Sequence, residues 1–400
     1  MQTMLRYTYT LLLSMLCLCG AWADSLQISV LTCAPGTDVY AHFGHTAIRL
    51  KNLDKQDDIV FNYGCFDYTE EMFVYKFIKG ETDYLLEVEP ADFFFKRYEY
   101  MGVQVDEQVL NITQPEAMNL FRLLVLNLQP ENKQYRYSYL YDNCTTRARD
   151  MIESALTEEV FYKKSSKRLT ARQELHECMQ KAPWLRFGID LVLGEEIDDP
   201  TFDKRHQMFI PAHFEAELDS AFIARDGGKL QPLISSKETI LQPNPTKEEA
   251  DTIITPTIVL CFMFIATLFM SIIDFCKRKV TYTLDATLCM TQGIAGILIS
   301  FLFFCSEHPA VNSNWLVGVF NPLFIAYAAY LIYCIVKKKN NVMAIAYMLI
   351  MIAFSITAMF VNQSFDIPTK LVILTLLTRS IFVYATELRI RKRKNNKNVQ

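Results

Sequence analysis

Residues 45–66 read "HTAIRLKNLDKQDDIVFNYGCF", and this stretch decides the fold of the N-terminal part of the chain. Apolar and polar residues alternate on both sides of the charged segment "LDKQDD", which is typical of two strands joined by a turn. The stretch therefore predicts an antiparallel β-hairpin. Ser25–Thr32 alternates in the same way and predicts another strand. Met72–Lys79 and Tyr84–Val88 are candidates to extend the sheet, although "MFVYKFI" is equally compatible with a helix.

Helical patterns follow the strands. From Gln114 onward, "PEAMNLFRLLVLNL" places apolar residues at helical spacing, with a proline near the start. In "YSYLYDNCTTRARDMIESAL", Asp142 and Asn143 are typical cap residues, and Thr145–Leu156 has a helical period. The pattern places Cys144 at a helix N-terminus and predicts an α+β domain.

Both ends of the chain are apolar, and 51% of its 400 residues are hydrophobic. An apolar run that ends in Ala21-Trp22-Ala23 predicts a secretory signal peptide over residues 1–23. An uncleaved anchor is the alternative. Beyond residue 250, apolar stretches of membrane length predict about five spans. They are Ile253–Phe275, Ala286–Cys305, Trp315–Val336, Val342–Val361 and Pro368–Thr386.

Basic clusters follow the first, third and fifth spans, at residues 277–279, 337–339 and 389–394. By the positive-inside rule, residues 24–249 form an exported domain, residues 250–388 a membrane domain and residues 389–400 a basic cytoplasmic tail. The net charge of −4 gives no sign of nucleic-acid binding. Arg379 and Asp285 fall near span ends, where reaching toward the interface would accommodate their charges.

Cys144 is the strongest candidate for chemistry. A thiol at a helix N-terminus faces unpaired N–H groups and the positive end of the helix dipole, which lower its pKa. A cysteine nucleophile also needs a base and a group that orients the base. His45 opens the first strand of the hairpin, and Asn62 on the second strand falls within one or two positions of the point opposite. Asp67 is a rival for the orienting role, because a carboxylate holds an imidazole more strongly than an amide does.

Other polar residues allow alternative sites. Cys33, His42, His45 and Cys65 form a set that could bind zinc, but they lack a CxxC pair, so neither a metal nor another cofactor is expected. His42 is expected only to shape the site. Between the second and third spans, "SEHPAVNSNWL" is either a solvated loop or a contact for lipid head groups. Its polar residues are Glu307, His308, Asn312 and Asn314.

The segments "LTCAPGTDVYAHFGHTAIRL", "FNYGCFDY" and "YLYDNCTTRARD", followed by a multispan region, resemble the Lnb family of envelope proteins. The order of histidine, polar residue and Asn-Cys pair also resembles the circularly permuted NlpC/P60, papain-like fold of the lecithin-retinol acyltransferase group. Asn62 departs from those relatives, which commonly carry a second histidine there.

The resemblance implies a lipoprotein N-acyltransferase at the bacterial inner membrane, with a phospholipid as acyl donor and a diacylated lipoprotein as acceptor. His45 would deprotonate Cys144, and backbone N–H groups near the thiol would hold the oxyanion, helped by Tyr141 or Asn143. Two alternatives remain open at this point: a thiol hydrolase acting on lipids, thioesters or cell-wall peptides, and a non-catalytic sensor or scaffold.

Overall fold

The computed structural model describes residues 25–36, 41–67, 69–163, 169–200, 208–225, 228–244 and 253–398. The expected signal peptide, residues 1–23, lies outside these ranges. The chain forms two compact units. The first comprises Met1–Thr69, Asp83–Ser166 and Lys204–Glu248, and the second Glu70–Thr82, Lys167–Asp203 and Glu249–Gln400.

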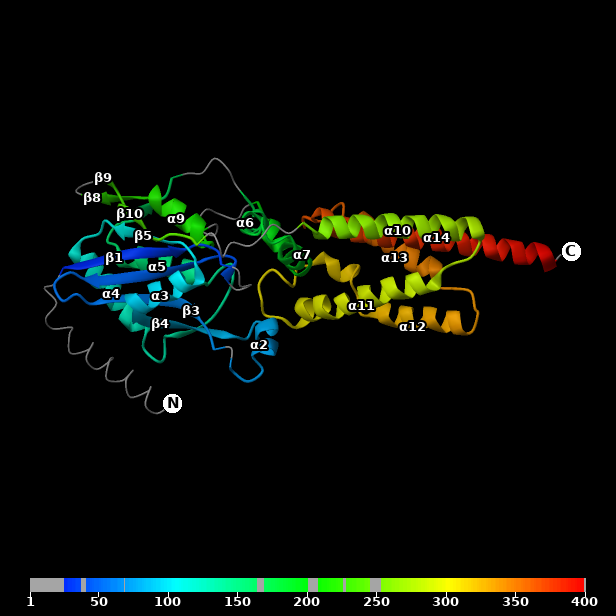
Figure 1. Cartoon of the computed structure of the whole chain (residues 1–400), viewed down its shortest axis with the longest axis horizontal. Helices are drawn as coiled ribbons and strands as arrows, with labels where there is room; N and C mark the ends of the chain where they lie inside the picture. The colour runs from blue at the N-terminus through cyan, green and yellow to red at the C-terminus, as the bar shows by residue number, and fades with distance from the viewer. Residues whose placement is uncertain are drawn as a thin grey trace. The chain divides into compact units, whose positions relative to one another are not determined.

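The first unit is built on a seven-stranded antiparallel sheet of order β10-β5-β1-β2-β3-β4-β6 (Figure 1). Its strands are β1 (Leu26–Cys33), β2 (His45–Asn52), β3 (Asp58–Cys65), β4 (Asp83–Pro90), β5 (Val105–Leu110), β6 (Gln134–Arg136) and β10 (Ile234–Leu241). The predicted hairpin is confirmed, because β2 pairs with β3 through Ile48 opposite Phe61 and Arg49 opposite Val60. This register sets Asn62 opposite Ala47, diagonal to His45.

Helices cover both faces of this sheet. On one side lie α4 (Gln114–Asn127), α5 (Cys144–Ala155) and α9 (Pro211–Asp219), and on the other lies α3 (Ala91–Met101). The side chains of β1 point alternately to the two faces of the sheet. Ile28 and Val30 join the core beneath α4 and α5, whereas Leu31 packs with Phe94 of α3. A small sheet of β7 (Val160–Phe161), β8 (Phe222–Arg225) and β9 (Lys229–Pro232) completes the unit. The predicted α+β class is confirmed.

A buried carboxylate joins the start of α4 to the small sheet. Glu116 accepts a hydrogen bond from the backbone of Thr113 in a capping box and is held by both terminal nitrogens of Arg225 at 2.7 Å. Burial alone raises the pKa of this carboxyl, but the bonds from Arg225, Thr113 and Thr157 outweigh it and lower the pKa to about 2. The ionised form of Glu116 therefore stabilises the folded unit.

The second unit contains the membrane domain. Its helices are α10 (Pro256–Lys277), α11 (Tyr282–Cys305), α12 (Leu323–Val336), α13 (Ala344–Thr357) and α14 (Ile367–Asn398), and the short η4 (Trp315–Gly318) precedes α12. Four segments of the described chain are long and apolar enough to cross a bilayer, and α13, with 14 residues, is a shorter apolar helix. These helices agree with the prediction of about five spans.

Two features hold the helices of this domain together. A Cβ at Gly293 or Gly296 would lie 2.6 Å from Ile325 or 2.5 Å from Asn321, so the glycines let α11 approach the segment that begins α12. The sequence predicted that Arg379 reaches toward the membrane interface, and this prediction is wrong. Arg379 is 2% exposed and forms ion pairs with Asp285 at 2.7 Å and Asp274 at 2.9 Å, because neighbouring helices supply its counter-ions.

Two segments that precede residue 249 also belong to the second unit. One is α2 (Phe73–Lys79), so the segment Met72–Lys79, for which the sequence allowed a strand or a helix, is a helix. The other contains α6 (Ala171–Cys178), α7 (Pro183–Val192) and η2 (Glu195–Asp198). Arg172, 3% exposed, pairs with Asp190 at 2.7 Å and Asp198 at 2.9 Å, which joins α6, α7 and η2. Asp198 also accepts a bond from the backbone of Ser364, which ties this cluster to the loop before α14.

Candidate active site

Cys144 is the first residue of α5, as the sequence predicts. The side-chain oxygen of Asn143 accepts bonds from the backbone of Thr145 and Thr146, both at 2.9 Å, and so caps the helix. The amide nitrogen of Asn143 donates to the carbonyls of Tyr139 at 2.7 Å and Phe209 at 2.9 Å. The oxygen and the nitrogen of this side-chain amide are thus both used to hold the start of the helix. The side chain of Asn143 therefore has no N–H left for the oxyanion role that the sequence predicted.

A chain of polar groups orients His45. Its Nε2 lies 3.2 Å from Oδ1 of Asn62, whose amide nitrogen donates to Glu89 at 2.9 Å. Glu89 in turn accepts two bonds from Arg97. An ionised carboxylate only accepts, so the Asn62 nitrogen must face Glu89 and its oxygen must face His45. Nε2 therefore carries a proton, which leaves Nδ1 as the ring nitrogen available to act as a base.

The thiol and the imidazole shift each other's pKa. Burial raises the pKa of Cys144, but the charge and hydrogen bond of His45, together with the backbone N–H of Thr46 and the hydroxyl of Thr145, outweigh burial and lower it. Burial lowers the pKa of His45, yet the charge and hydrogen bond of Cys144 and the bond to Asn62 raise it overall. The pKa of the thiol is thus shifted toward the thiolate form, and the pKa of the imidazole toward the imidazolium form.

Two threonines connect the elements that carry these groups. Thr46 and Thr145 are fully buried, and their hydroxyl oxygens lie 3.1 Å apart. The Thr145 hydroxyl also lies 3.8 Å from Sγ of Cys144. Because Thr46 directly follows His45 and Thr145 directly follows Cys144, this hydrogen bond fixes strand β2 against the start of α5.

Gly64 provides room beside the thiol. It has a φ of 89° at an irregularity in the pairing of β3 with β4, and a Cβ built there would meet Cβ of Cys144 at 3.6 Å. The same position is 3.9 Å from the hydroxyl of Tyr135, which is buried and has no hydrogen-bond partner among the described residues. Burial raises the pKa of Tyr135, so its hydroxyl keeps its proton. The sequence did not indicate Tyr135, because it lies on the three-residue strand β6 at the sheet edge.

Other predicted residues lie in different surroundings. Asp67 accepts bonds from the backbone and hydroxyl of Thr69 and is exposed, so it is Asn62 that contacts His45. Tyr141 is 39% exposed on the loop before α5, and His42 is buried. Cys33, Cys65, Cys144 and Cys178 are free thiols. Within the described ranges no three His, Cys, Asp or Glu side chains converge as a metal site would require.

The four loop residues expected near lipid head groups belong to the second unit. His308 contacts the carbonyl of Phe77 at 2.6 Å, and the backbone of Glu307 donates to Lys79 at 2.7 Å, so both lie beside α2. Asn312 is exposed. Asn314 is 1% exposed, its amide nitrogen donates to the carbonyl of Leu191 at 2.8 Å, and its amide oxygen accepts from Gln363 at 3.0 Å, so it presents no surface to a head group.

The fold and the site define a membrane protein whose α+β domain holds a Cys-His-Asn set. The sequence matches the Lnb N-terminal periplasmic domain over residues 21–175 and the Lnb transmembrane domain over residues 247–391. The two matches cover most of the chain, and the protein belongs to the Lnb family. A periplasmic domain joined to a transmembrane domain indicates a bacterial inner-membrane protein. No curated protein and no solved structure matches the chain.

Proposed function

We propose that this protein is a lipoprotein N-acyltransferase that works through a thioester on Cys144. The observation that carries the proposal is the hydrogen-bonded series of Cys144, His45, Asn62 and Glu89, which lowers the pKa of a thiol and fixes the tautomer of its base. Membership of the Lnb family suggests a membrane enzyme that modifies lipoproteins. The membrane helices support a lipid substrate over a cell-wall peptide.

In the first half-reaction, Nδ1 of His45 takes the thiol proton, and Sγ attacks the carbonyl carbon of a phospholipid ester. The bond between that carbon and the glycerol oxygen breaks, and His45 delivers the proton to the leaving oxygen. The products are an acyl thioester on Cys144 and a lysophospholipid. In the second half-reaction, the α-amine of a diacylglyceryl-cysteine attacks the thioester. The C–S bond breaks, an amide forms, and the amine proton returns to the thiolate through His45.

The oxyanion of each half-reaction needs hydrogen-bond donors aimed at the oxygen on which negative charge develops. At the start of α5 the N–H groups of Asn143, Thr145 and Thr146 are already bonded within the cap, so we assign this role to the backbone N–H of Cys144. We assign a further donor to Tyr135, whose hydroxyl is buried, protonated and without a partner among the described residues, and lies beside Gly64. Asn143 supports the site by holding the helix start in place.

The expected organisation of the chain belongs to the same proposal. Residues 1–23 are removed as a signal peptide, residues 24–249 face the periplasm and the basic C-terminal tail stays in the cytoplasm. The order of His45 on β2, Asn62 on β3 and Cys144 at the start of α5 supports a relationship with the permuted NlpC/P60 fold.

Mass spectrometry of the full-length protein tests this function. The protein in detergent is incubated with phospholipid and then with a synthetic diacylated lipopeptide. We expect an acyl adduct on the peptide that contains Cys144, then a triacylated product and loss of the adduct. The Cys144→Ser variant should give neither, and Cys178→Ser is the matched control that should give both. No adduct and no triacylated product would refute the proposal, and an adduct that only water discharges would assign a hydrolase.

A further inference from the structure

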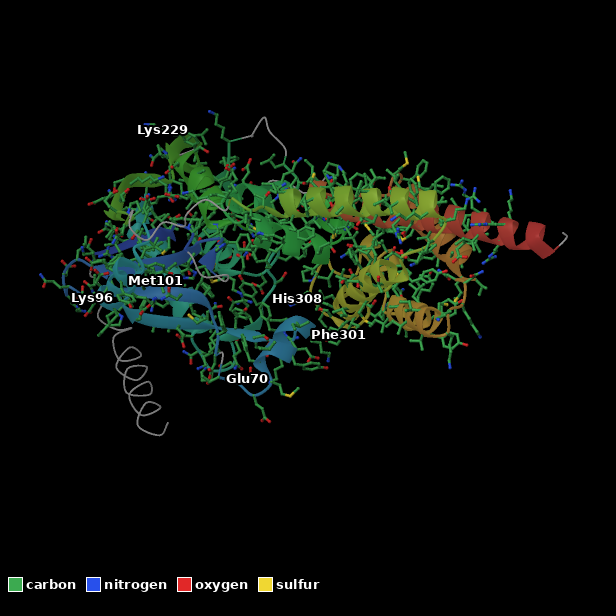
Figure 2. The ribbon with its side chains drawn as sticks, turned by 45° about the vertical axis from the view of Figure 1, so that its right-hand side comes forward. Glu70, Lys96, Met101, Lys229, Phe301 and His308 are labelled. Carbon is green, nitrogen blue, oxygen red and sulfur yellow. The ribbon has the colours of Figure 1, made fainter. Side chains whose placement is uncertain are left out.

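An apolar groove lies within the second unit between α2 and α11. Its volume is about 340 Å³, and its walls are Tyr75 and Ile78 of α2 and Ile294, Ile297, Leu298 and Phe301 of α11. Figure 2 shows Phe301 and His308 at the α2 end of this unit. Five of the six lining side chains are hydrocarbon and the sixth, Tyr75, contributes an aromatic ring, so the groove favours an apolar ligand.

Hydrogen bonds fix α2 as one wall of the groove. The last carbonyls of this helix accept from the loop after α11: Ser306 donates to Ile78 at 2.9 Å, the backbone of Glu307 donates to Lys79, and the ring of His308 contacts Phe77. These bonds satisfy carbonyls that a helix end leaves unpaired. At Gly80, φ is 81°, and a Cβ would lie 2.7 Å from the backbone nitrogen of His308. The contact is therefore a close and specific one.

The open side of the groove faces the surroundings of a membrane helix. Ile294, Ile297 and Leu298 are 58%, 53% and 45% exposed on α11, whose 24 residues are sufficient to span a bilayer. If α11 spans the bilayer as its length and composition allow, apolar side chains exposed on it face lipid hydrocarbon. On α2, Val74 is 68% exposed, so this short helix also presents apolar surface. Lipid is thus the molecule that reaches the groove from the bilayer.

We propose that this groove holds one acyl chain of the phospholipid donor. The inference rests on the proposed function and names a binding site for its first substrate. The volume is at the lower end of the range for small-molecule sites, roughly 300–1,000 Å³, which suits a single chain better than a whole lipid. The groove opens toward the bulk hydrocarbon, where phospholipid is the abundant source of chains. An acyl chain prefers the groove to the bulk bilayer because it packs closely between two fixed walls, and not because it leaves water.

A photo-crosslinking experiment tests the groove directly. Full-length protein is reconstituted in vesicles that contain phosphatidylethanolamine with a diazirine in one acyl chain. Ile297→Trp fills the groove, and Ile265→Trp is the matched control at an exposed position of α10. We expect crosslinks on α2 and α11 that Ile297→Trp reduces about three- to tenfold and Ile265→Trp leaves unchanged, since the loss is one of packing. Equal crosslinking in the two variants overturns the proposal.

A second readout separates this site from the chemistry. Acylation of Cys144 by phospholipid should show a raised KM in Ile297→Trp, whereas acylation by a short water-soluble acetyl ester should keep its rate. A diazirine lipopeptide that crosslinks to the groove in place of the phospholipid overturns the assignment of the occupant. If Cys144 forms no adduct while the phospholipid still crosslinks to α2 and α11, the proposed function fails and the lipid site stands.

Discussion

Cys144 is expected to be the most reactive thiol of residues 24–249. Burial raises the pKa of Cys65 to about 12 and that of Cys178 to about 11. At pH 7 these thiols are ionised in about one molecule in 10⁵ and one in 10⁴. The pKa of Cys144 is instead lowered, because the charge and hydrogen bond of His45 outweigh burial, so a larger fraction of this thiol is ionised at the same pH. We therefore expect iodoacetamide to alkylate Cys144 faster than Cys178 at pH 7.

Limited alkylation of the full-length protein measures this difference. Iodoacetamide is added at a series of pH values, the reaction is quenched, and each cysteine peptide is quantified by mass spectrometry. In His45→Ala the charge that lowers the pKa of Cys144 is gone while burial remains, so the pH midpoint should move above that of the wild type. His42→Ala is the matched control and should keep the wild-type profile.

Two results would refute this account of the thiol. One is Cys144 labelled no faster than Cys178 at pH 7, while both react fully in guanidinium chloride. The other is an unchanged pH midpoint in His45→Ala, which would show that the imidazole does not stabilise the thiolate. Either result would also remove the basis for an acyl-enzyme mechanism.

Four further predictions follow from the structure. Asn62→Ala releases Nε2 of His45 and should lower kcat about 10²-fold, less than the roughly 10⁴-fold lost with a buried orienting carboxylate; an unchanged kcat would remove Asn62 from the site. Tyr135→Phe should lower kcat about 10²- to 10³-fold, as loss of an oxyanion donor does, without lowering the melting temperature, because the hydroxyl has no partner among the described residues. The pKa of Glu116 is lowered to about 2, so the ionised carboxylate adds to the free energy of unfolding above pH 4.5. As the pH falls toward about 2, the free energy of unfolding should decrease by on the order of 3 kcal/mol. Chemical denaturation of Glu116→Gln over the same pH range should not show this decrease. Arg379→Met leaves two buried carboxylates without a counter-ion and should destabilise the membrane domain by about 3–5 kcal/mol in detergent unfolding, whereas a change under 1 kcal/mol would contradict a structural ion pair.

The hairpin of β2 and β3 and the start of α5 could be predicted because their signals are local. Alternation over β2 and β3 and the charged turn between them set a register that places Asn62 diagonal to His45. Asn143 identified the start of α5 through the preference of amide side chains for the cap position. In both places the residues that determine the geometry lie within about 20 positions of one another.

Other parts of the structure depend on contacts between distant segments. The seven residues of α2 have no clear period, and the loop after α11 satisfies the end of that helix across more than 200 positions. The counter-ions of Arg379 come from two other helices, so its position near a span end gave no indication of its burial. Tyr135 lies on an edge strand too short to show alternation, and only its distance from Gly64 connects it with the thiol.

The contact between Thr46 and Thr145 supports the proposed pair of His45 and Cys144 from outside the pair itself. A strand and a helix that are 99 positions apart in sequence must hold an imidazole against a thiol, although desolvation opposes charge on both groups. The hydroxyls of Thr46 and Thr145 are hydrogen-bonded to each other. This bond joins β2 to α5 at the residues that directly follow His45 and Cys144. Each hydroxyl is buried, and loss of one partner leaves the other unsatisfied at a cost of about 1–3 kcal/mol. The hydrogen bond therefore opposes separation of the two elements, and the thiolate and the imidazolium can offset their desolvation only while they remain in contact.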